Sequence, residues 1–338
     1  MNKKILVVGG AGYIGSHMVL ALQDAGFSVT VFDNLSRGFA DAVPAGILIE
    51  GDLLSKDDLK KCFAAKKFDA VIHFAALAYV GESMFEPERY YENNVIGTLN
   101  LLSEMRRWNV GNIIFSSSCA TYGEPKHIPI KEEHPQSPIN PYGHTKYIIE
   151  QVLTHYAQAY GLRSVNLRYF NAAGCDSQGR VGERHDPETH LIPLVLAEAQ
   201  RTRQGGQPEG TGLKVFGSDF DTPDGSCIRD YVHVHDLCTA HLLAMERMFA
   251  GVGQGAEFFN LANGDGFSVL EVISVCRKVT GEPILYQQFP RRPGDPAKLV
   301  GDARRAGAEL GWQPDYTSLA EIVKMAWNWL LQESKIEN

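Results

Sequence analysis

A glycine-rich hexapeptide between an apolar run and a helical pattern most limits how this chain folds. The run Lys4–Val8 predicts a buried strand, the hexapeptide GAGYIG begins at Gly10, and residues 16–22 predict an amphipathic helix. Gly10 permits a tight turn, Gly12 lets the backbone approach a phosphate, and Gly15 lets the helix lie close to the strand. The free N–H groups at the helix start attract a pyrophosphate. The sequence therefore predicts a dinucleotide-binding turn.

An acidic residue at the end of the next expected strand supports that prediction. Residues 28–32 have a strand pattern, and Asp33 follows them directly. A carboxylate at this place accepts a hydrogen bond from a ribose 2′-hydroxyl and repels a 2′-phosphate. We therefore predict NAD rather than NADP as the cofactor. Arg37 lies four residues further on, and we interpret it as a solvated loop cation.

Short apolar runs alternate with helical patterns through the first half of the chain. The expected strands are residues 5–8, 29–32, 47–50, 70–74, 112–116 and 164–169. The expected helices are residues 14–25, 56–65, 87–108 and 142–160. This alternation predicts an α/β fold with a Rossmann-type doubly wound parallel sheet, in which ligands bind at the carboxyl ends of the strands.

The second half of the chain is less regular, and we expect a smaller α/β substrate domain that closes over the carboxyl edge of the strands. Beyond residue 171 the segments are polar and rich in glycine. Residues 258–262 nevertheless predict one more strand, preceded by a helix over residues 236–248. The expected domains are an NAD-binding domain and a mainly UDP-sugar-binding domain, namely residues 1–175 with 230–263 returning to them, and residues 176–338.

Composition and charge exclude several classes of function. The formal net charge is −8, from 32 basic and 40 acidic residues, so no basic surface for nucleic acid or anionic membrane is indicated. No apolar run approaches the ~20 residues that a membrane-spanning helix needs. The six cysteines form no C-x-x-C pair, which argues against a zinc site and a disulfide framework. We expect a cytoplasmic protein.

The spacing of the histidines does not predict a metal site. His233 and His235, with Asp236 beside them, suggest metal ligands at alternate strand positions, but no third ligand is evident from the sequence. We therefore interpret them as packing residues. His185 and His190 lack a spacing typical of metal ligands. No metal is expected from the sequence.

The second informative motif is Tyr142-x-x-x-Lys146, preceded by Pro141, which suits the first turn of a helix. Residues four apart share a helix face, so the ammonium can lie beside the phenol. A phenol with a pKa of ~10 needs a downward shift of ~3 units to act as a base near neutral pH. An exposed ion pair supplies only ~0–1 kcal/mol, so a dry site and an oxidised nicotinamide ring must add the rest. We predict catalysis by this pair, against the alternative of an exposed surface pair.

A run of serines supplies a third candidate element. Residues 116–118 follow the strand expected over residues 112–116, which places their hydroxyls at the carboxyl edge of the sheet. Ser118 can then bond a substrate hydroxyl and relay its proton to Tyr142. The alternative is a serine-rich turn that satisfies its own backbone. The position of Ser118, 24 residues before Tyr142, favours a catalytic role.

Motifs along essentially the whole chain carry a family resemblance. In chain order they are GGAGYIGSH, FDN, GDL, HFAA, VGES, NNVIGT, SSSCATYG, PYGHTK, LRYFNAAG, RDYVHVHDL and RRPGD. The chain resembles the nucleotide-sugar epimerases of the extended short-chain dehydrogenase/reductase family, and within it the UDP-glucose 4-epimerases. The resemblance implies an isomerase of galactose metabolism that interconverts UDP-galactose and UDP-glucose. The reaction would proceed by transient oxidation at C4 with tightly bound NAD.

The resemblance also implies roles for individual residues. The catalytic residues would be Ser118, Tyr142 and Lys146. Those that bind NAD would be Gly9, Gly12, Tyr13, Ile14, Gly15, Asp33, Asn34, Asp52, Leu53, Phe74, Ala75, Ala76, Asn93, Tyr142, Lys146 and Tyr169. Those that bind the UDP-sugar would be Ser118, Tyr142, Asn171, His190, Leu191, Phe216, Arg229, Arg292 and Asp295. The family also implies a homodimer formed through the helices expected at 87–108 and 142–160.

Departures from the family pattern leave the sugar and some alternatives open. Ala78 replaces a lysine common near the cofactor, and Leu299 replaces a tyrosine common beside the sugar. A 4-epimerase of UDP-N-acetylglucosamine or of UDP-xylose/arabinose is therefore the main alternative. A UDP-sugar 4,6-dehydratase would need a carboxylate where Cys119 and Ala120 stand. A net dehydrogenase would release reduced cofactor, and a non-catalytic NAD-sensing module would not need the Tyr142/Lys146 pair.

Overall fold

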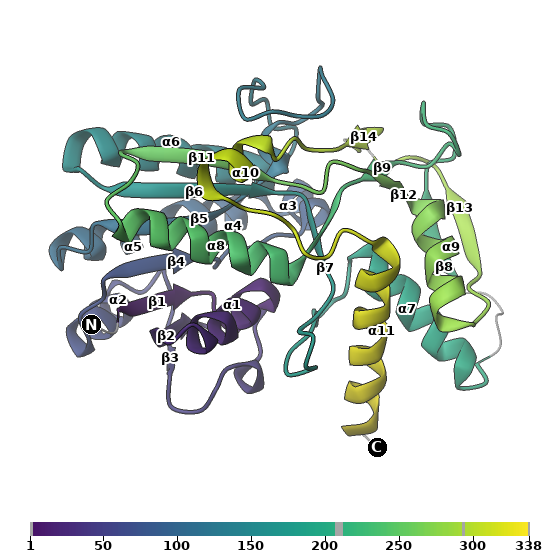
Figure 1. Ribbon diagram of the computed structural model, residues 1–338, viewed down its shortest axis with the longest axis horizontal. Helices are drawn as coiled ribbons and strands as arrows, with labels where there is room; N and C mark the ends of the chain where they lie inside the picture. The colour runs from purple at the N-terminus through teal and green to yellow at the C-terminus, as the bar shows by residue number, and fades with distance from the viewer. Residues whose placement is uncertain (1–2, 207–211, 293–294, 337–338) are drawn as a thin grey trace.

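The largest unit of the molecule is a seven-stranded parallel sheet, seen in the left half of Figure 1. The computed structural model describes residues 3–206, 212–292 and 295–336. Across the sheet the strands are β11 (Ala256–Leu261), β6 (Arg163–Tyr169), β5 (Asn112–Ser118), β4 (Ala70–His73), β1 (Lys4–Val8), β2 (Ser28–Asp33) and β3 (Leu48–Glu50). All neighbouring strands are parallel, which confirms the doubly wound fold expected from the sequence.

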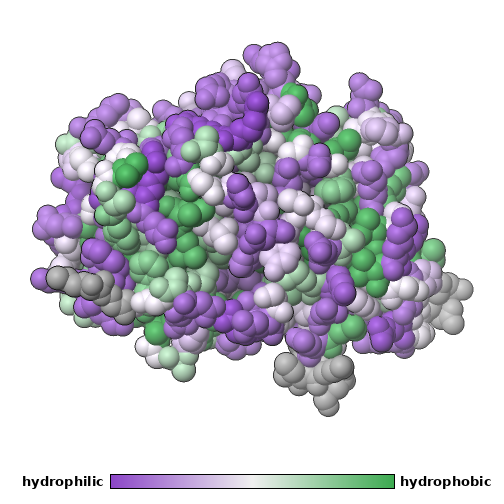
Figure 2. All heavy atoms as spheres, viewed as in Figure 1, coloured by the Kyte–Doolittle hydropathy of each residue, from purple (hydrophilic) through white to green (hydrophobic). Residues whose placement is uncertain are grey.

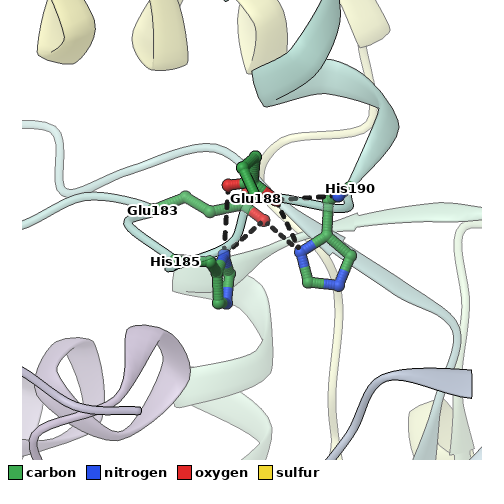
Figure 3. Close-up of side chains that lie close together, drawn as sticks. All are labelled: Glu183, His185, Glu188 and His190. Carbon is green, nitrogen blue, oxygen red and sulfur yellow. Dashed lines mark hydrogen bonds and ion pairs between the residues drawn. The ribbon is translucent and has the colours of Figure 1, made fainter. Parts of the chain in front are cut away.

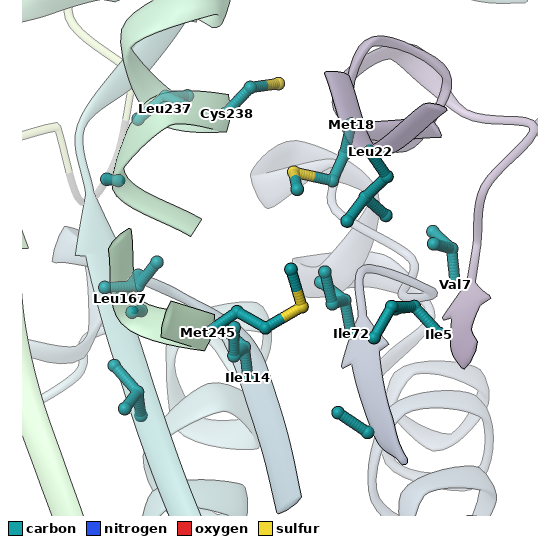
Figure 4. Packing of buried hydrophobic residues seen from close by; sticks show 14 of the residues in the cluster. Ile5, Val7, Met18, Leu22, Ile72, Ile114, Leu167, Leu237, Cys238 and Met245 are labelled. Atoms are coloured by element: carbon teal, nitrogen blue, oxygen red, sulfur yellow. The ribbon is translucent and has the colours of Figure 1, made fainter. Parts of the chain in front are cut away.

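One face of the sheet is covered by three helices that come from distant parts of the chain. Ile5 and Val7 of β1 face this side, because alternate strand residues point to the same face. Figure 4 shows Met18 and Leu22 meeting Met245 over these strands. The covering helices are α1 (Tyr13–Asp24), α8 (Val234–Phe249) and α10 (Arg304–Leu310).

The opposite face carries a second core built in the same way. Leu6 and Val8 of β1 belong to it, so the strand is apolar on both sides, as a buried parallel strand must be. The helices over this face are α2 (Lys56–Ala65), α5 (Gly97–Arg107) and α6 (Pro141–Tyr160). Helix α6 carries the expected catalytic residues Tyr142 and Lys146 in its first turns.

The order of the strands reverses beside β1. The chain runs outward from β1 to β3 on one side and from β4 to β6 on the other. In open α/β sheets such a switch point leaves a crevice at the carboxyl ends of the strands, where ligands bind. Gly9, which follows β1, and Phe74, which follows β4, both lie at this crevice.

The remaining elements form a smaller unit beside the sheet, on the right of Figure 1. Its helices α7 (Leu191–Arg203), α9 (Val269–Thr280) and α11 (Leu319–Ile336) share a third hydrophobic core. Three small sheets complete it. They pair β8 (Leu213–Phe216) with β13 (Tyr286–Phe289), β7 (Asn171–Ala173) with β10 (Tyr231–His233), and β9 (Ile228–Arg229) with both β12 (Phe267–Ser268) and β14 (Lys298–Leu299).

The helix expected over residues 87–108 is wrong in detail. The structure divides this stretch into α4 (Pro87–Tyr90), a π-helical turn η2 (Tyr91–Ile96) and α5. A further helix, α3 (Val80–Phe85), precedes it and was not expected. A π turn inside a helix changes the direction in which the following side chains point, and such turns occur frequently at functional sites. The described residues also contain two short 3₁₀ turns, η1 (Ala40–Ala42) and η3 (Cys119–Thr121).

The surface gives no sign of membrane insertion by a helix. Among the described residues, no helix is both long enough and apolar enough to cross a bilayer. In the view of Figure 2, hydrophilic residues are spread over the face, with smaller groups of hydrophobic residues between them.

Candidate active site

The glycine turn after β1 has the close contacts that the sequence predicts. Gly9 has a φ of +82°, and a Cβ there would lie 2.4 Å from the backbone nitrogen of Ala75. A Cβ on Gly15 would lie 2.1 Å from the carbonyl oxygen of Gly9. A Cβ on Gly12 would instead meet only that oxygen, at 3.6 Å, so the space in front of the helix start is open. This open cradle at the N-terminus of α1 fits a dinucleotide pyrophosphate.

Asp33 lies at the end of β2 and holds the turn in place. Its carboxylate accepts hydrogen bonds from the backbone N–H groups of Ala11 and Leu35, both at 2.9 Å. Burial raises the pKa of Asp33, and these two bonds oppose the rise. The residue thus shapes the glycine turn and remains at the crevice where a ribose is expected.

Arg37 is not the solvated cation expected from the sequence. Its guanidinium donates to Glu82 at 2.9 Å and to the carbonyl oxygen of Asp186 at 2.7 Å, and it stacks over Tyr79. Arg37 also lines the crevice, but its charge is already engaged by a carboxylate. This engagement agrees with a site for NAD rather than for a 2′-phosphate.

The crevice brings together ten of the residues expected to bind the cofactor. They are Gly9, Gly12, Asp33, Asn34, Asp52, Leu53, Phe74, Ala75, Ala76 and Asn93. Ser36, Gly38 and Leu77 line it as well and were not expected. The nearby Asn34 amide donates to Asp52 at 3.0 Å, which links the ends of β2 and β3 at the side where adenosine is expected. The residues present therefore fit a bound dinucleotide.

Three further residues of the expected cofactor set do not line this crevice but lie near its wall. Tyr13 is buried, and its hydroxyl donates to the carbonyl oxygen of Gly174 at 2.6 Å. Ile14 packs against the core of the first sheet face. Gly15 has only its close approach to Gly9. In the structure these residues support the turn, and a direct contact with NAD stays a prediction.

Lys146 is buried near the N-terminal end of α6. Its Nζ donates to the carbonyl oxygen of Ser116 at 2.7 Å and lies 5.9 Å from the ring centre of Tyr142. The Ser116 hydroxyl forms a very short hydrogen bond with the hydroxyl of Tyr169. The sequence did not predict the part played by Ser116. Helix α6 and the ends of β5 and β6 thus hold one ammonium, two phenols and two serines in one group.

Burial opposes ionisation of both members of the expected catalytic pair. It raises the pKa of Tyr142 to about 12, and the Ser118 hydroxyl opposes that rise. Burial also lowers the pKa of Lys146 to about 7, although the Glu150 carboxylate opposes the fall. The chain by itself therefore does not produce a phenolate near neutral pH. This agrees with the expectation that a bound nicotinamide cation is needed.

Ser118 ends β5 and begins the 3₁₀ turn η3. Its Oγ accepts from the backbone N–H of Ala120 at 3.1 Å, and its carbonyl accepts from the hydroxyl of Thr121 at 3.0 Å. The first of these bonds is the serine-turn alternative considered above. It uses an acceptor position of Oγ and leaves the hydroxyl proton free to be donated. A role in proton relay stays a prediction.

A buried ion pair behind the site was missed from the sequence. Glu150 and Arg168 form a bond of 2.7 Å between Oε2 and Nη2, and both side chains are almost fully buried. Ser117 donates to Glu150 Oε1 at 2.5 Å, and Arg168 also donates to Tyr122 at 2.9 Å. The signal was present, because residues 142, 146 and 150 recur every four positions and share one face of α6.

The π-helical turn gives Asn93 and Asn94 two different tasks. Asn93 lines the crevice, whereas Asn94 is buried. Asn94 accepts from the N–H of Leu77 at 2.8 Å and donates to Thr145 at 3.0 Å. It therefore fastens the segment after β4 to helix α6. No sequence signal distinguishes the two residues, because the π turn depends on tertiary packing.

Four residues expected to bind the UDP portion form a connected group in the smaller unit. Asp295 accepts from Arg229 and from Arg292, each at 3.0 Å. The Arg292 guanidinium lies 4.9 Å over the ring of Phe216. Two forked guanidinium groups suit a diphosphate, and an aromatic ring beside them suits a base. The roles of these residues toward substrate stay predictions.

The other expected substrate residues lie at the boundary between the two units. Asn171 begins β7, and Leu191 begins α7. His190 precedes Leu191 and turns its Nδ1 to within 2.9 Å of Glu183 Oε1. Although burial opposes the change, Glu183 and Glu188 raise the pKa of His190 to about 10. Its Nδ1 is thus directed toward carboxylates of its own loop.

The sequence and the structure have close counterparts among known proteins. Residues 5–262 match the model of the NAD dependent epimerase/dehydratase family. A UDP-glucose 4-epimerase of Halalkalibacterium halodurans is 52% identical over 325 residues, which cover 96% of this chain and 95% of that one.

Solved structures agree with the sequence match. The UDP-glucose 4-epimerase of Brucella ovis in complex with NAD is 47% identical, with a TM-score of 0.90 over 96% of this chain and 98% of that one. The UDP-glucose 4-epimerase of Bifidobacterium longum, in complex with NAD+ and UDP, is 37% identical. Its TM-score is 0.90 over 98% of this chain and 99% of that one.

Proposed function

The chain belongs to the NAD dependent epimerase/dehydratase family, and on that premise we propose that it acts as a UDP-glucose 4-epimerase with bound NAD. It interconverts UDP-galactose and UDP-glucose by inverting C4 of the hexose. The observation that carries this function is the pairing of Tyr142 with the buried Lys146, together with a crevice that fits a dinucleotide. Bound NAD, held by the residues of this crevice, would supply an acceptor for the C4 hydride and a donor for its return to the opposite face.

Tyr142 is the group that moves the proton in this proposal. As the phenolate, it takes the proton of the sugar 4-hydroxyl, directly or through Ser118, to become the phenol, and it gives that proton back after inversion. Lys146 is held by the Ser116 carbonyl, so its ammonium cannot swing away from the phenol. General base catalysis of this kind contributes typically ~10²- to 10⁴-fold in rate.

The smaller unit anchors the part of the substrate that does not react. Arg229 and Arg292 face the diphosphate, Asp295 orients both, and Phe216 lies beside the uracil. Binding energy from this remote part of the substrate keeps the oxidised sugar in the site while the sugar rotates to present its other face. We assign Asn171, His190 and Leu191 to the same subsite. Residues 1–175 with 230–263 then serve the cofactor, and residues 176–338 mainly serve the substrate.

A homodimer fits the exposed apolar residues around helix α6. Large hydrophobic side chains are exposed on α3, η2 and α5, among them Phe85 at 86% and Ile96 at 47%. Several large apolar side chains exposed on neighbouring helices favour an interaction site. We propose a dimer through these helices and α6, which light scattering of the purified protein tests. The six unpaired cysteines favour a reducing compartment, so we also propose the cytoplasm as the location and galactose metabolism as the role.

The deciding experiment supplies UDP-galactose to the purified protein without added NAD and follows the sugar by NMR. We expect conversion to an equilibrium mixture with UDP-glucose, because the cofactor stays bound between turnovers. Accumulation of reduced nicotinamide would instead identify a net dehydrogenase, and loss of water would identify a 4,6-dehydratase. Absence of any sugar product from protein that contains NAD would contradict the proposal and favour a sensing module.

The same assay decides between sugars. Leu299, which is smaller than the tyrosine common at this position, packs against a buried cluster that contains Cys119, the neighbour of Ser118. Parallel reactions with UDP-N-acetylglucosamine and UDP-xylose measure how far the site accepts other sugars. We expect UDP-galactose to give the highest kcat/KM.

A further inference from the structure

Four side chains of one short loop converge next to the proposed substrate subsite, and one of them, His190, belongs to both, with its Nδ1 directed at the cluster. Glu183, His185, Glu188 and His190 lie between β7 and α7, and each offers one ligand atom to a common space (Figure 3). The four atoms lie within 4.8 Å of one another. Neither the sequence spacing nor the proposed epimerase mechanism accounts for two imidazoles and two carboxylates directed at a single point.

The distances between these atoms match the edges of a coordination polyhedron. His190 Nδ1 lies 2.9 Å from Glu183 Oε1. His185 Nδ1 lies 3.2 Å from Glu188 Oε2 and 3.7 Å from Glu183 Oε1. Ligands ~2.0–2.1 Å from a tetrahedral zinc ion are about 3.3 Å apart. The observed nitrogen–oxygen distances lie on both sides of that value.

The hydrogen bonding of the cluster is incomplete in a way that points to a ligand. The Glu183 side chain is only 5% exposed, yet its Oε1 has no hydrogen-bond partner. His190 Nδ1 is likewise buried without one, although it is 2.9 Å from that oxygen. The two atoms are close, but they are not aligned as donor and acceptor. Buried polar atoms without partners call for an ion or another bound group.

Glu188 is fixed in the orientation that a ligand needs. Its Oε1 accepts from the backbone N–H groups of Thr189 and His190, both at 2.7 Å. Its Oε2 is therefore left to face His185 and the centre of the cluster. Outer hydrogen bonds of this kind orient metal ligands in proteins. In Figure 3 the other ring nitrogen of His190, Nε2, points away from the cluster.

We propose that Glu183, His185, Glu188 and His190 bind one divalent transition-metal ion, with zinc as the preferred ion. Two carboxylates neutralise the double positive charge, and two imidazoles select against Mg²⁺ and Ca²⁺, which prefer oxygen ligands. The comparable group at His235, Asp236 and Asp315 is a poorer candidate. There both oxygens of Asp236 already accept backbone N–H groups, from Asp315 and Tyr316.

The ion would fasten the loop that joins the two units of the molecule. The His185 ring meets Tyr13 of the glycine turn edge-on, with ring centres 5.9 Å apart. Asp186, in the same loop, accepts from Arg37 at the cofactor crevice. His190 directly precedes α7 and so connects the loop to the smaller unit. The site is structural, because its four protein ligands leave no open position for chemistry.

The test measures zinc in the full-length, NAD-loaded protein after removal of all purification tags. Protein is stripped with a chelator, dialysed against ZnCl₂ and then buffer, and analysed by elemental mass spectrometry. We expect about one zinc per chain, as a four-ligand site requires. His185→Gln should weaken zinc binding by more than the roughly 10- to 100-fold that loss of an outer-shell partner costs. His235→Gln is the matched control and should retain the zinc of the unchanged protein.

Cobalt gives a second readout that does not depend on how the variants fold. Co²⁺ added to the stripped protein should show the visible absorption of tetrahedral coordination without a thiolate charge-transfer band, because the cysteines are buried. Zinc should also raise the melting temperature of the unchanged protein more than that of His185→Gln. The proposal is overturned if the unchanged protein retains no zinc. In that case a protonated His190 pairs with the two carboxylates in place of a metal ion. The proposal is also overturned if His185→Gln binds zinc equally well. Neither result bears on epimerase activity, which the sugar assay measures separately.

Discussion

Lys146 donates a 2.7 Å hydrogen bond from Nζ to the backbone carbonyl oxygen of Ser116, and this bond connects helix α6 to the end of strand β5. The acceptor is a main-chain atom, so no substitution at position 116 removes it. The ammonium is thereby fixed relative to the sheet and to the cofactor crevice. This bond explains how a long, flexible side chain keeps one position beside Tyr142 in a site that must act on both faces of a sugar.

Replacement of the phenol is expected to stop turnover without emptying the cofactor site. In Tyr142→Phe the ring and its packing remain, but the proton acceptor is lost, so kcat should fall by ~10²- to 10⁴-fold or more. NAD content, measured after denaturation, should stay unchanged. Tyr147→Phe, one turn further along the same helix, is the matched control and should keep full activity. Activity in Tyr142→Phe close to that of the control would remove Tyr142 from the mechanism.

Loss of the buried carboxylate behind the site should destabilise the whole fold. Glu150→Gln leaves Arg168 charged and buried without its partner, which typically costs ~3–5 kcal/mol. The free energy of unfolding, from chemical denaturation, measures this cost. Glu309→Gln removes a carboxylate from an exposed pair with Arg305 and should cost no more than ~1 kcal/mol. Equal losses of unfolding free energy in the two variants would show that the buried pair stabilises the fold no more than the exposed pair does.

The central sheet could be predicted from the sequence because its strands are buried on both faces. Such strands have near-continuous apolar runs, and the helices between them repeat at helical spacing. Even β11, far along the chain, was visible as the run around Phe258 and Phe259. The prediction of one continuous helix over residues 87–108 failed because the helical pattern conceals a π turn at Tyr91–Ile96. That turn depends on the hydrogen bonds of Asn94 to Leu77 and Thr145.

The candidate site was predictable where a motif fixes local geometry and was not where distant segments meet. The glycine motif predicts the tight turn after the first strand, and the four-residue spacing of Tyr142 and Lys146 predicts that the two side chains share one helix face. Arg37 was misread because its partners, Glu82 and Asp186, are far away in sequence. The group of Glu183 to His190 is local, but its ligand spacing follows no helix or strand repeat. Only the fold shows its side chains converging.

Added volume in the glycine turn should displace the cofactor. In Gly15→Ala the new methyl group would lie 2.1 Å from the carbonyl oxygen of Gly9, a backbone atom that cannot move cheaply. We expect NAD content to fall severalfold and stability to drop by ~1–3 kcal/mol, as for overpacking. Gly81→Ala is the control, because no atom lies within 4 Å of its added methyl group. If Gly15→Ala purifies with its full content of NAD, the close approach is not what positions the cofactor.

Buried neutral histidines should make the fold sensitive to acid. Burial lowers the pKa of His73 from 6.5 to about 3, so the folded state binds its proton less readily than the unfolded chain. The contribution of neutral His73 to the free energy of unfolding is therefore complete above pH ~6.5. It is lost as the pH falls toward 3, at ~1.4 kcal/mol per pH unit. His73→Gln should reduce the slope of unfolding free energy against pH between ~6.5 and 4 by about that amount. His155→Gln, at an exposed position, should leave the slope unchanged. Denaturation at a series of pH values measures both slopes, and identical slopes would contradict the assignment.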